Sequence, residues 1–244
     1  TMLVLSMGAL LLAGTLSAQT PIPEWQAGVD KMKSLIQTNP AQASEEVGGL
    51  LKGKNKKNVD LVTSVAHVYL DAGKLTEAQE YLAMAKKADN KDPKVSVLEG
   101  DIALAQKDIG QACQLYEQAI YFDPNCKEAY LKYAQAYKSA SPALAIEKLE
   151  QLKAVDPNCL EADRELAEVY YSSNRFGKAA EMYAKFIDTP LATEDDMLKY
   201  AFALFLNHDF EKSLQVAQKG LQKNARHAAF NRLVMYNNTD LKRY

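Results

Sequence analysis

The chain has 244 residues, of which 48% are hydrophobic and 25% are charged. This composition is ordinary for a folded globular protein and argues against a disordered chain. The formal net charge is -2, from 29 Lys and Arg against 31 Asp and Glu. No global electrostatic field therefore favours nucleic acid or an acidic membrane surface, and we expect no nucleic-acid partner.

The first 18 residues form one apolar stretch with small residues toward its end. Its core, residues 2–12, has the length of the hydrophobic part of a secretory signal peptide and is shorter than the roughly 20 residues of a membrane-spanning helix. We expect residues 1–18 to be a signal peptide that is cleaved after Ala18; an uncleaved anchor is the alternative. The pattern predicts a periplasmic or otherwise exported protein, without membrane insertion after cleavage.

Residues 19–58 are interpreted as a linker and an N-terminal capping hairpin. Two helical stretches are expected here, at residues 24–37 and 40–52, separated by a turn that ends at Pro40. The apolar side chains expected to pack on the following helices are Trp25, Val29, Met32 and Ile36. A basic run closes the segment and is typical of a solvated linker; its members are Lys52, Lys54, Lys56 and Lys57.

An internal repeat begins at residue 59. The string Asp-Pro-Asn-Cys at residues 123–126 recurs at 156–159, in each case between two expected helices. One series of small residues recurs every 33 or 34 positions, at Ala78, Ala112, Ala145, Ala179 and Ser213. A second series precedes it, at Ala66, Gly100, Ala134, Ala167 and Ala201. Small residues on two antiparallel helices let the backbones approach closely, so the period predicts stacked helix hairpins.

This period, with its order of small and aromatic residues and closing prolines, resembles the tetratricopeptide repeat. The resemblance covers residues 59–244 and implies an all-α, right-handed superhelical solenoid of antiparallel helix hairpins, as in an exported bacterial member of the family. The expected units are 59–92, 93–126, 127–159, 160–193 and 194–227, with 228–244 as the first helix of an incomplete sixth unit. The third unit departs from the pattern, because it is one residue short and carries Ser141 and Pro142 where glycine is usual.

No motif in the chain indicates catalysis, nucleotide binding or metal binding. Its glycines form neither a GxxxxGK[ST] nor a GxGxxG pattern. The three histidines lie in different units without an HExxH or CxxC pattern, and no GxSxG elbow occurs. The sequence therefore predicts no catalytic residues, no metal site and no cofactor, and a protein that is not an enzyme.

The resemblance also implies a concave groove lined by the first helix of each hairpin, with positions 2, 5, 9 and 12 of each unit directed into it. The candidate binding residues at these positions are His67, Asp101, Gln135, Lys138, Arg164, Glu168, Tyr171, Leu198, Phe202 and Phe205. The remaining positions of this set are Asp60, Thr63, Leu70, Lys94, Val97, Leu104, Glu128, Leu131, Glu161 and Asp195.

The last four candidates, from Tyr171 onward, would give the groove an apolar and aromatic end. Such side chains are typical anchors for a peptide or helix of a partner. The alternative is that Phe202 and Phe205 pack against a further helix. Together with the export signal, the repeat predicts a protein–protein interaction scaffold or adaptor in the cell envelope. The alternative function is a structural spacer or self-association module attached to an unseen C-terminal domain.

Overall fold

The computed structural model describes residues 22–242, so the predicted signal peptide lies outside the described residues. Within this range the chain forms thirteen α-helices and one short 3₁₀ helix, η1, and no strand. The elements are α1 (Gln26–Leu35), α2 (Pro40–Leu50), η1 (Gly53–Lys57), α3 (Val59–Asp71), α4 (Leu75–Ala88), α5 (Pro93–Ala105), α6 (Ile109–Phe122), α7 (Lys127–Tyr137), α8 (Pro142–Val155), α9 (Leu160–Ser172), α10 (Phe176–Phe186), α11 (Glu194–Leu206), α12 (Phe210–Lys223) and α13 (Ala228–Asp240).

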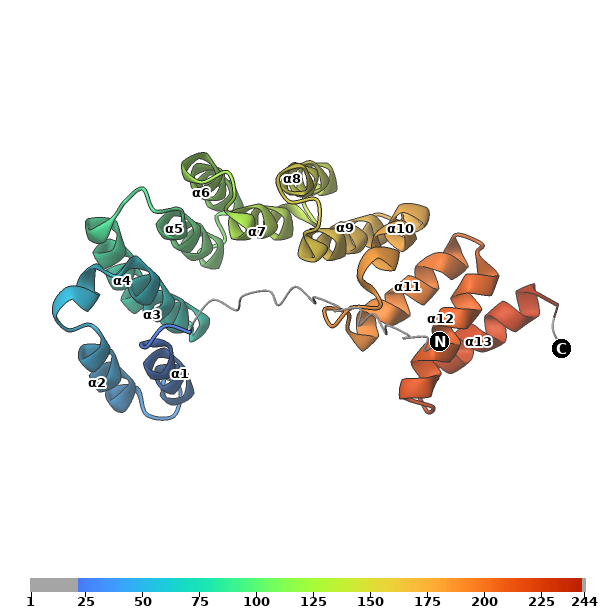
Figure 1. The fold of residues 1–244 in the computed structure, drawn as a ribbon, viewed down its shortest axis with the longest axis horizontal. Coiled ribbons are helices and arrows are strands. Elements are labelled where there is room, and N and C mark those ends of the chain that lie inside the picture. The colour runs from blue at the N-terminus through green and yellow to red at the C-terminus, as the bar shows by residue number, and fades with distance from the viewer. Residues whose placement is uncertain (1–21, 243–244) are drawn as a thin grey trace, which may run out of the picture.

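Consecutive helices pack in pairs, and the pairs stack into an arc (Figure 1). The first helices of the pairs, such as α3, α5, α7 and α9, lie on the inner side of the arc, and their partners lie on the outer side. Neighbouring first helices also contact one another: α3 contacts α5, and α7 contacts α9. The predicted all-α solenoid of helix hairpins is therefore confirmed.

Most helices begin where the sequence supplies a capping residue. The side chains of Asn58 and Asp108 accept hydrogen bonds from backbone N–H groups in the first turns of α3 and α6. Pro93 and Pro142 stand at the first positions of α5 and α8, where the missing N–H costs nothing. At α11, Thr193 and Asp196 form a reciprocal capping box.

In four of the five repeat units, the turn between the paired helices places one residue in the left-handed region of φ. These residues are Gly73, Lys107, Asn174 and His208, with φ between 58° and 74°. The third unit differs: α7 ends at Tyr137 and α8 begins at Pro142, and none of the described residues between them has a positive φ. Four residues separate these two helices, against three in the other units, and Pro142 fixes φ at the start of α8, so this turn closes without a left-handed residue.

The predicted small residues lie where paired helices approach most closely. Ala78, Ala112, Ala145, Ala179 and Ser213 are all fully buried. Gly100 of α5 faces Tyr116 of α6, and a Cβ atom added to Gly100 would lie 2.5 Å from the ring. The bulky ring thus fills the space that the missing side chain leaves.

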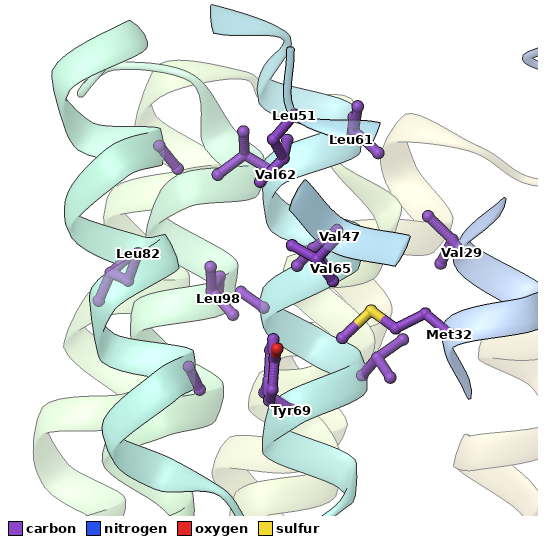
Figure 2. Packing of buried hydrophobic residues seen from close by; sticks show 14 of the residues in the cluster. Val29, Met32, Val47, Leu51, Leu61, Val62, Val65, Tyr69, Leu82 and Leu98 are labelled. Carbon is purple, nitrogen blue, oxygen red and sulfur yellow. The ribbon is translucent and has the colours of Figure 1, made fainter. Parts of the chain in front are cut away.

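The N-terminal hairpin is part of the continuous core. Val29 and Met32 of α1 and Val47 of α2 pack with Val65 and Tyr69 of α3 (Figure 2). Ile36 is also buried in this cluster, and Trp25 is partly buried against it, as the sequence predicts. This hairpin therefore covers the apolar face that the first repeat unit would otherwise expose.

Asp163 of α9 is a buried charge in the first turn of its helix. Its side chain is 3% exposed and receives hydrogen bonds from Lys153, at 2.8 Å, and from Lys185, at 3.1 Å. Two lysines from the flanking helices α8 and α10 thus neutralise the carboxylate, which would be strongly unfavourable if unpaired.

Candidate protein-binding face

The inner side of the arc carries polar side chains that link one first helix to the next. Lys94 of α5 pairs with Asp60 of α3. Lys127 of α7 lies 2.9 Å from Glu161 of α9. These links join consecutive units, so the face is held together by contacts between repeats as well as by its apolar core.

Asp101 of α5 is the centre of one such network. Its Oδ2 atom lies 3.1 Å from His67 Nε2 of α3 and accepts a hydrogen bond of 2.9 Å from Lys132 Nζ of α7. Its Oδ1 atom accepts a hydrogen bond of 2.7 Å from the hydroxyl of Tyr116. Burial alone would raise the pKa of Asp101, but the contacts with His67, Lys132 and Tyr116 outweigh it and lower the pKa.

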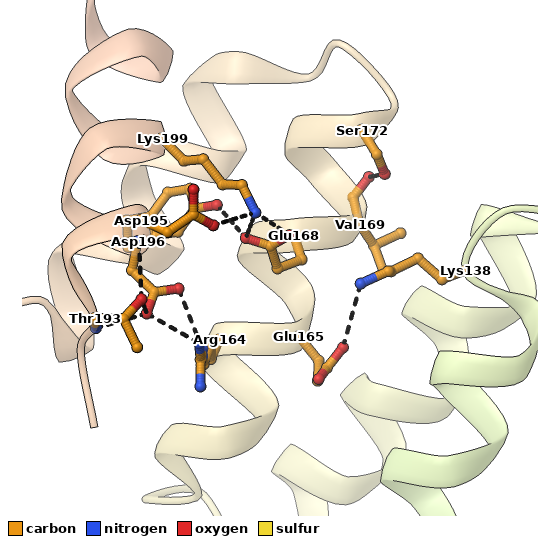
Figure 3. A network of polar contacts seen from close by, with 11 residues as sticks. Lys138, Arg164, Glu165, Glu168, Val169, Ser172, Thr193, Asp195, Asp196 and Lys199 are labelled. Carbon is orange, nitrogen blue, oxygen red and sulfur yellow. Dashed lines mark hydrogen bonds and ion pairs between the residues drawn. The ribbon is translucent and has the colours of Figure 1, made fainter. Parts of the chain in front are cut away.

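Glu168 of α9 repeats this arrangement two units later. Its carboxylate accepts a hydrogen bond of 2.7 Å from Tyr183. It accepts two more from Lys199, at 2.9 and 3.0 Å (Figure 3). Lys199 also lies 2.8 Å from Asp195 of its own helix. Burial, and then the hydrogen bond to Glu168, raises the pKa of Tyr183, so its hydroxyl remains a donor.

The two networks share one pattern: an acid on a first helix, a tyrosine on its partner, and a lysine on the next first helix. Each residue of the later network lies 67 positions after its counterpart. Sequence reasoning missed Lys132 and Lys199, because the family positions directed into the groove do not include theirs. The recurrence of acid, tyrosine and lysine at one spacing was the signal that could have identified them.

Two further predicted residues, Gln135 of α7 and Lys138 directly after this helix, contact the next first helix through Glu165. Gln135 donates a hydrogen bond of 2.9 Å to Glu165 Oε1, and Lys138 Nζ lies 3.9 Å from Oε2. Arg164 of α9 contacts Asp196 of α11 through two nitrogen atoms, each at 3.1 Å (Figure 3). Six of the ten candidate binding residues therefore contact a neighbouring unit, namely His67, Asp101, Gln135, Lys138, Arg164 and Glu168.

The predicted aromatic end is half-buried. Tyr171 packs edge to face on Phe176, with ring centroids 5.7 Å apart. Phe205 packs in the same way on Phe210, at 5.4 Å, and also meets Tyr236 of α13, at 6.2 Å. Leu198 and Phe202 lie partly buried against the cluster of Met197, Ala201, Ala217, Phe230 and Leu233. Part of this surface thus serves internal packing, including packing against α13.

A hollow of about 320 Å³ lies at the other, N-terminal end of the inner face. Its walls come from the start of the described chain and from α3, α5 and α7. The lining residues are Pro23, Trp25, Asp60, Thr63, Ser64, His67, Lys94, Val97 and Glu128. Six of these nine occupy positions that the sequence directed into the groove. Trp25 was predicted only as a packing residue, and the structure gives it a wall of this hollow.

Two kinds of site are absent from the part of the chain that the structure describes. Residues 22–242 bring together no group of three or more His, Cys, Asp or Glu side chains that could hold a metal ion. No helix among them combines the length and apolar character needed to cross a bilayer. The absence of catalysis stays a prediction.

The hairpin solenoid and its polar inner face define the chain as an α-helical repeat protein. The model of the tetratricopeptide repeat matches residues 65–125 and 135–192. These two stretches of the chain consist of tetratricopeptide repeats. No curated protein matches it in sequence.

Three solved structures share the fold over most of their length. PilW, described as a widely conserved type IV pilus biogenesis factor, has a TM-score of 0.65 at 17% identity, covering 86% of this chain and 97% of PilW. PilF of Pseudomonas aeruginosa has a TM-score of 0.62 at 16% identity, covering 85% and 95%. YrrB, a repeat protein described with an unusual peptide-binding site, has a TM-score of 0.55 at 14% identity, covering 84% and 97%.

Family and fold together support one class of function. Tetratricopeptide solenoids bind other proteins or peptides, and stacked repeats of this kind offer extended concave surfaces for binding. The chain therefore has the architecture of a protein–protein interaction scaffold.

Proposed function

We propose that the chain is an adaptor of the cell envelope that binds an extended peptide or a helix of a partner protein on its concave face. The observation that carries the proposal is the hollow beside Trp25, because it is concave and joins four segments of the chain. A large aromatic side chain beside polar groups is a common composition of protein-binding surfaces.

The polar links of the inner face support this proposal. His67, Asp101 and Lys132 tie three consecutive first helices together, and Glu168 and Lys199 tie two more. A face that is already ordered loses less conformational entropy when a partner binds. Since most charges are paired within the face, partner selection depends on local contacts in the hollow more than on net charge.

The location in the envelope rests on the apolar stretch at residues 2–12, which has the length of a signal-peptide core. PilW, which shares the fold, is described as a pilus biogenesis factor, and YrrB as a protein with a peptide-binding site. The description of YrrB agrees with the proposed mode of binding, and at 14–17% identity the likeness of both proteins to this chain is one of fold.

Affinity capture from envelope extracts tests the proposal. Lys94→Glu turns the exposed Lys94–Asp60 pair into a repulsive one at the edge of the hollow. We expect the wild-type chain to capture a defined partner and Lys94→Glu to weaken this capture about tenfold, or roughly 1.4 kcal/mol. Lys223→Glu, an equal charge reversal at an exposed position of α12, is the matched control and should have no effect.

Equal capture by all three proteins would overturn the proposal. Capture of only the chain's own copies would instead favour the alternative of a spacer or self-association module. The exposed Met235 and Tyr236 of α13, which are 55% and 43% accessible, are the surface that such self-association would use.

A further inference from the structure

A second hollow lies on the outer side of the solenoid, where α2, η1 and α4 meet. Its volume is about 380 Å³. Its lining residues are Ser44, Val47, Gly48, Leu51, Lys52, Gly53, Lys56, Tyr81 and Met84. None of these described lining residues is acidic, so the only formal charges in its wall are those of two lysines.

The floor of this outer hollow is apolar and recessed. Val47 and Leu51 are buried, and Tyr81 and Met84 are partly buried against the same core cluster. The ring of Tyr81 is stacked on that of Tyr69, with centroids 5.3 Å apart and an angle of 8° between the planes. The floor is therefore held in place by the core and can accept an apolar side chain from outside.

Positive charge is concentrated at the rim of the hollow. Lys52 and Lys56 line the hollow, and Lys54 and Lys57 lie beside them in the sequence. None of the four forms an ion pair within residues 22–242. Nearby lysines differ, since Lys31 pairs with Glu46 and Lys74 pairs with Glu77.

The segment that carries these lysines has a defined conformation. Gly53 has a φ of 56°, and Asn55 donates a side-chain hydrogen bond of 3.0 Å to the carbonyl of Leu50 at the end of α2. The lysines are therefore presented by a folded turn beside the hollow and do not belong to a long linker.

We propose that the outer hollow binds an acidic peptide segment of a partner protein. One apolar side chain of the segment enters the hollow and contacts Val47, Tyr81 and Met84, while the flanking carboxylates pair with the lysines of the rim. Charge complementarity selects the acidic partner, because the rim offers positive charges without internal partners. This surface lies on the opposite side of the arc from the concave face, so the inference extends beyond the proposed function.

A lipid surface fits these features less well. Peripheral membrane binding needs apolar side chains that protrude and insert into the bilayer. Here the apolar side chains are recessed, and all large hydrophobic side chains of the described chain that are exposed lie outside residues 40–90. A nucleic acid would need a free aromatic face for stacking, and Tyr69 covers one face of the Tyr81 ring.

Fluorescence anisotropy with the full chain tests the inference. The probe is a fluorescein-labelled peptide in which a single leucine is flanked on both sides by glutamates. We expect saturable binding that falls at least about tenfold in the charge-reversal variant Lys52→Glu/Lys56→Glu. The matched control is Lys107→Glu/Lys223→Glu, which reverses two exposed charges away from the hollow and should bind like wild type.

A second pair of variants separates the hollow from the charge. Gly48 lines the outer hollow, whereas its neighbour Gly49 does not, and a Cβ atom at either position meets no other atom within 4 Å. Gly48→Gln should therefore obstruct the hollow and weaken binding, while Gly49→Gln should leave it unchanged. Both variants should remain folded.

Several results would overturn the inference. These are the absence of saturable binding, equal binding by both charge-reversal variants, and equal binding of a peptide whose leucine is replaced by glycine. Sedimentation with phosphatidylserine vesicles that depends on Lys52 and Lys56, without peptide binding, would assign the surface to an anionic membrane and also overturn it.

Discussion

Asp101 links three repeat units through one buried carboxylate. It is 7% exposed and contacts His67 of the preceding unit, Tyr116 of its own unit and Lys132 of the following one. Hydrogen bonds to a charged group contribute about 1.5–3 kcal/mol each, and partners left without an acceptor cost a similar amount. At this residue, stability and the shape of the inner face depend on the same contacts.

We predict that Asp101→Asn lowers the free energy of unfolding by about 2–3 kcal/mol at neutral pH. The pKa of Asp101 is lowered in the folded chain. Its stabilisation is therefore present above the unfolded-state pKa of about 3.9 and is lost as the pH falls through the lower folded-state value. Urea unfolding of wild type and Asp101→Asn, from neutral to strongly acidic pH, measures how this stabilisation changes with pH.

The difference between wild type and Asp101→Asn should shrink on acidification. Asp60→Asn is the control: its carboxylate is about half exposed in an ion pair with Lys94, so it should cost less than about 1 kcal/mol. A difference in unfolding free energy between wild type and Asp101→Asn that is constant with pH, or that grows below pH 4, would contradict the stabilising role assigned to the Asp101 carboxylate.

Gly100 provides a second prediction at the scale of the residue. A methyl group there would meet the Tyr116 ring at 2.5 Å and the Ala112 carbonyl oxygen at 3.1 Å. We expect Gly100→Ala to destabilise the chain by about 1–3 kcal/mol through overpacking. Gly48→Ala, where the added Cβ meets nothing within 4 Å, should instead stabilise α2 by about 0.5–1 kcal/mol. The midpoints of denaturant unfolding distinguish the two variants. Midpoint shifts of the same sign for Gly100→Ala and Gly48→Ala would contradict this account.

The candidate site could be predicted from the sequence only in part, and Glu168 shows why. Its position in the repeat predicts that Glu168 lies on the inner face. That position does not predict which side chains bind its carboxylate. Those partners, Tyr183 and Lys199, depend on side-chain length and on packing between units. Trp25 is similar: its burial follows from its hydrophobicity, but its place in the wall of the hollow depends on α3, α5 and α7.

At the scale of the element, the turns within the five repeat units follow one design with one exception. Gly73, Lys107, Asn174 and His208 hold the left-handed position, and the third unit uses Ser141 and Pro142. The repeat period predicts where the helices lie because small residues and prolines recur with it. It does not predict that Lys107 and His208 take a conformation that favours glycine, because neighbouring contacts impose it on them.

Substitutions at this turn position should have opposite effects. Gly73→Ala forces a Cβ atom into the left-handed region, at a φ of 74°, and should cost about 1–2 kcal/mol. Lys107→Gly removes the same strain, at a φ of 67°, and should raise the free energy of unfolding by up to about 1 kcal/mol. Thermal unfolding measures both. An unchanged stability for Gly73→Ala would show that the turn is not under this constraint.

At the scale of the whole molecule, the core is a series of clusters along the arc. The first joins α1 and α2 to the first two repeat units, and the last joins α11 and α12 to α13. Each cluster is shared between neighbouring pairs, so stability depends on contacts between adjacent units. Because the core is linear, the period in the sequence was enough to predict the fold. The hollows lie where side chains from several units meet, and no period specifies them.

The central claim is that a partner protein binds the concave face beside Trp25. Photocrosslinking in intact cells tests it directly, with a photoreactive residue in place either of Lys94 on this face or of Gln118, an exposed residue of the outer helix α6. The account predicts one specific adduct with another protein from position 94 and none from position 118. Equal adducts from both positions, or adducts of the chain only with itself, would contradict it.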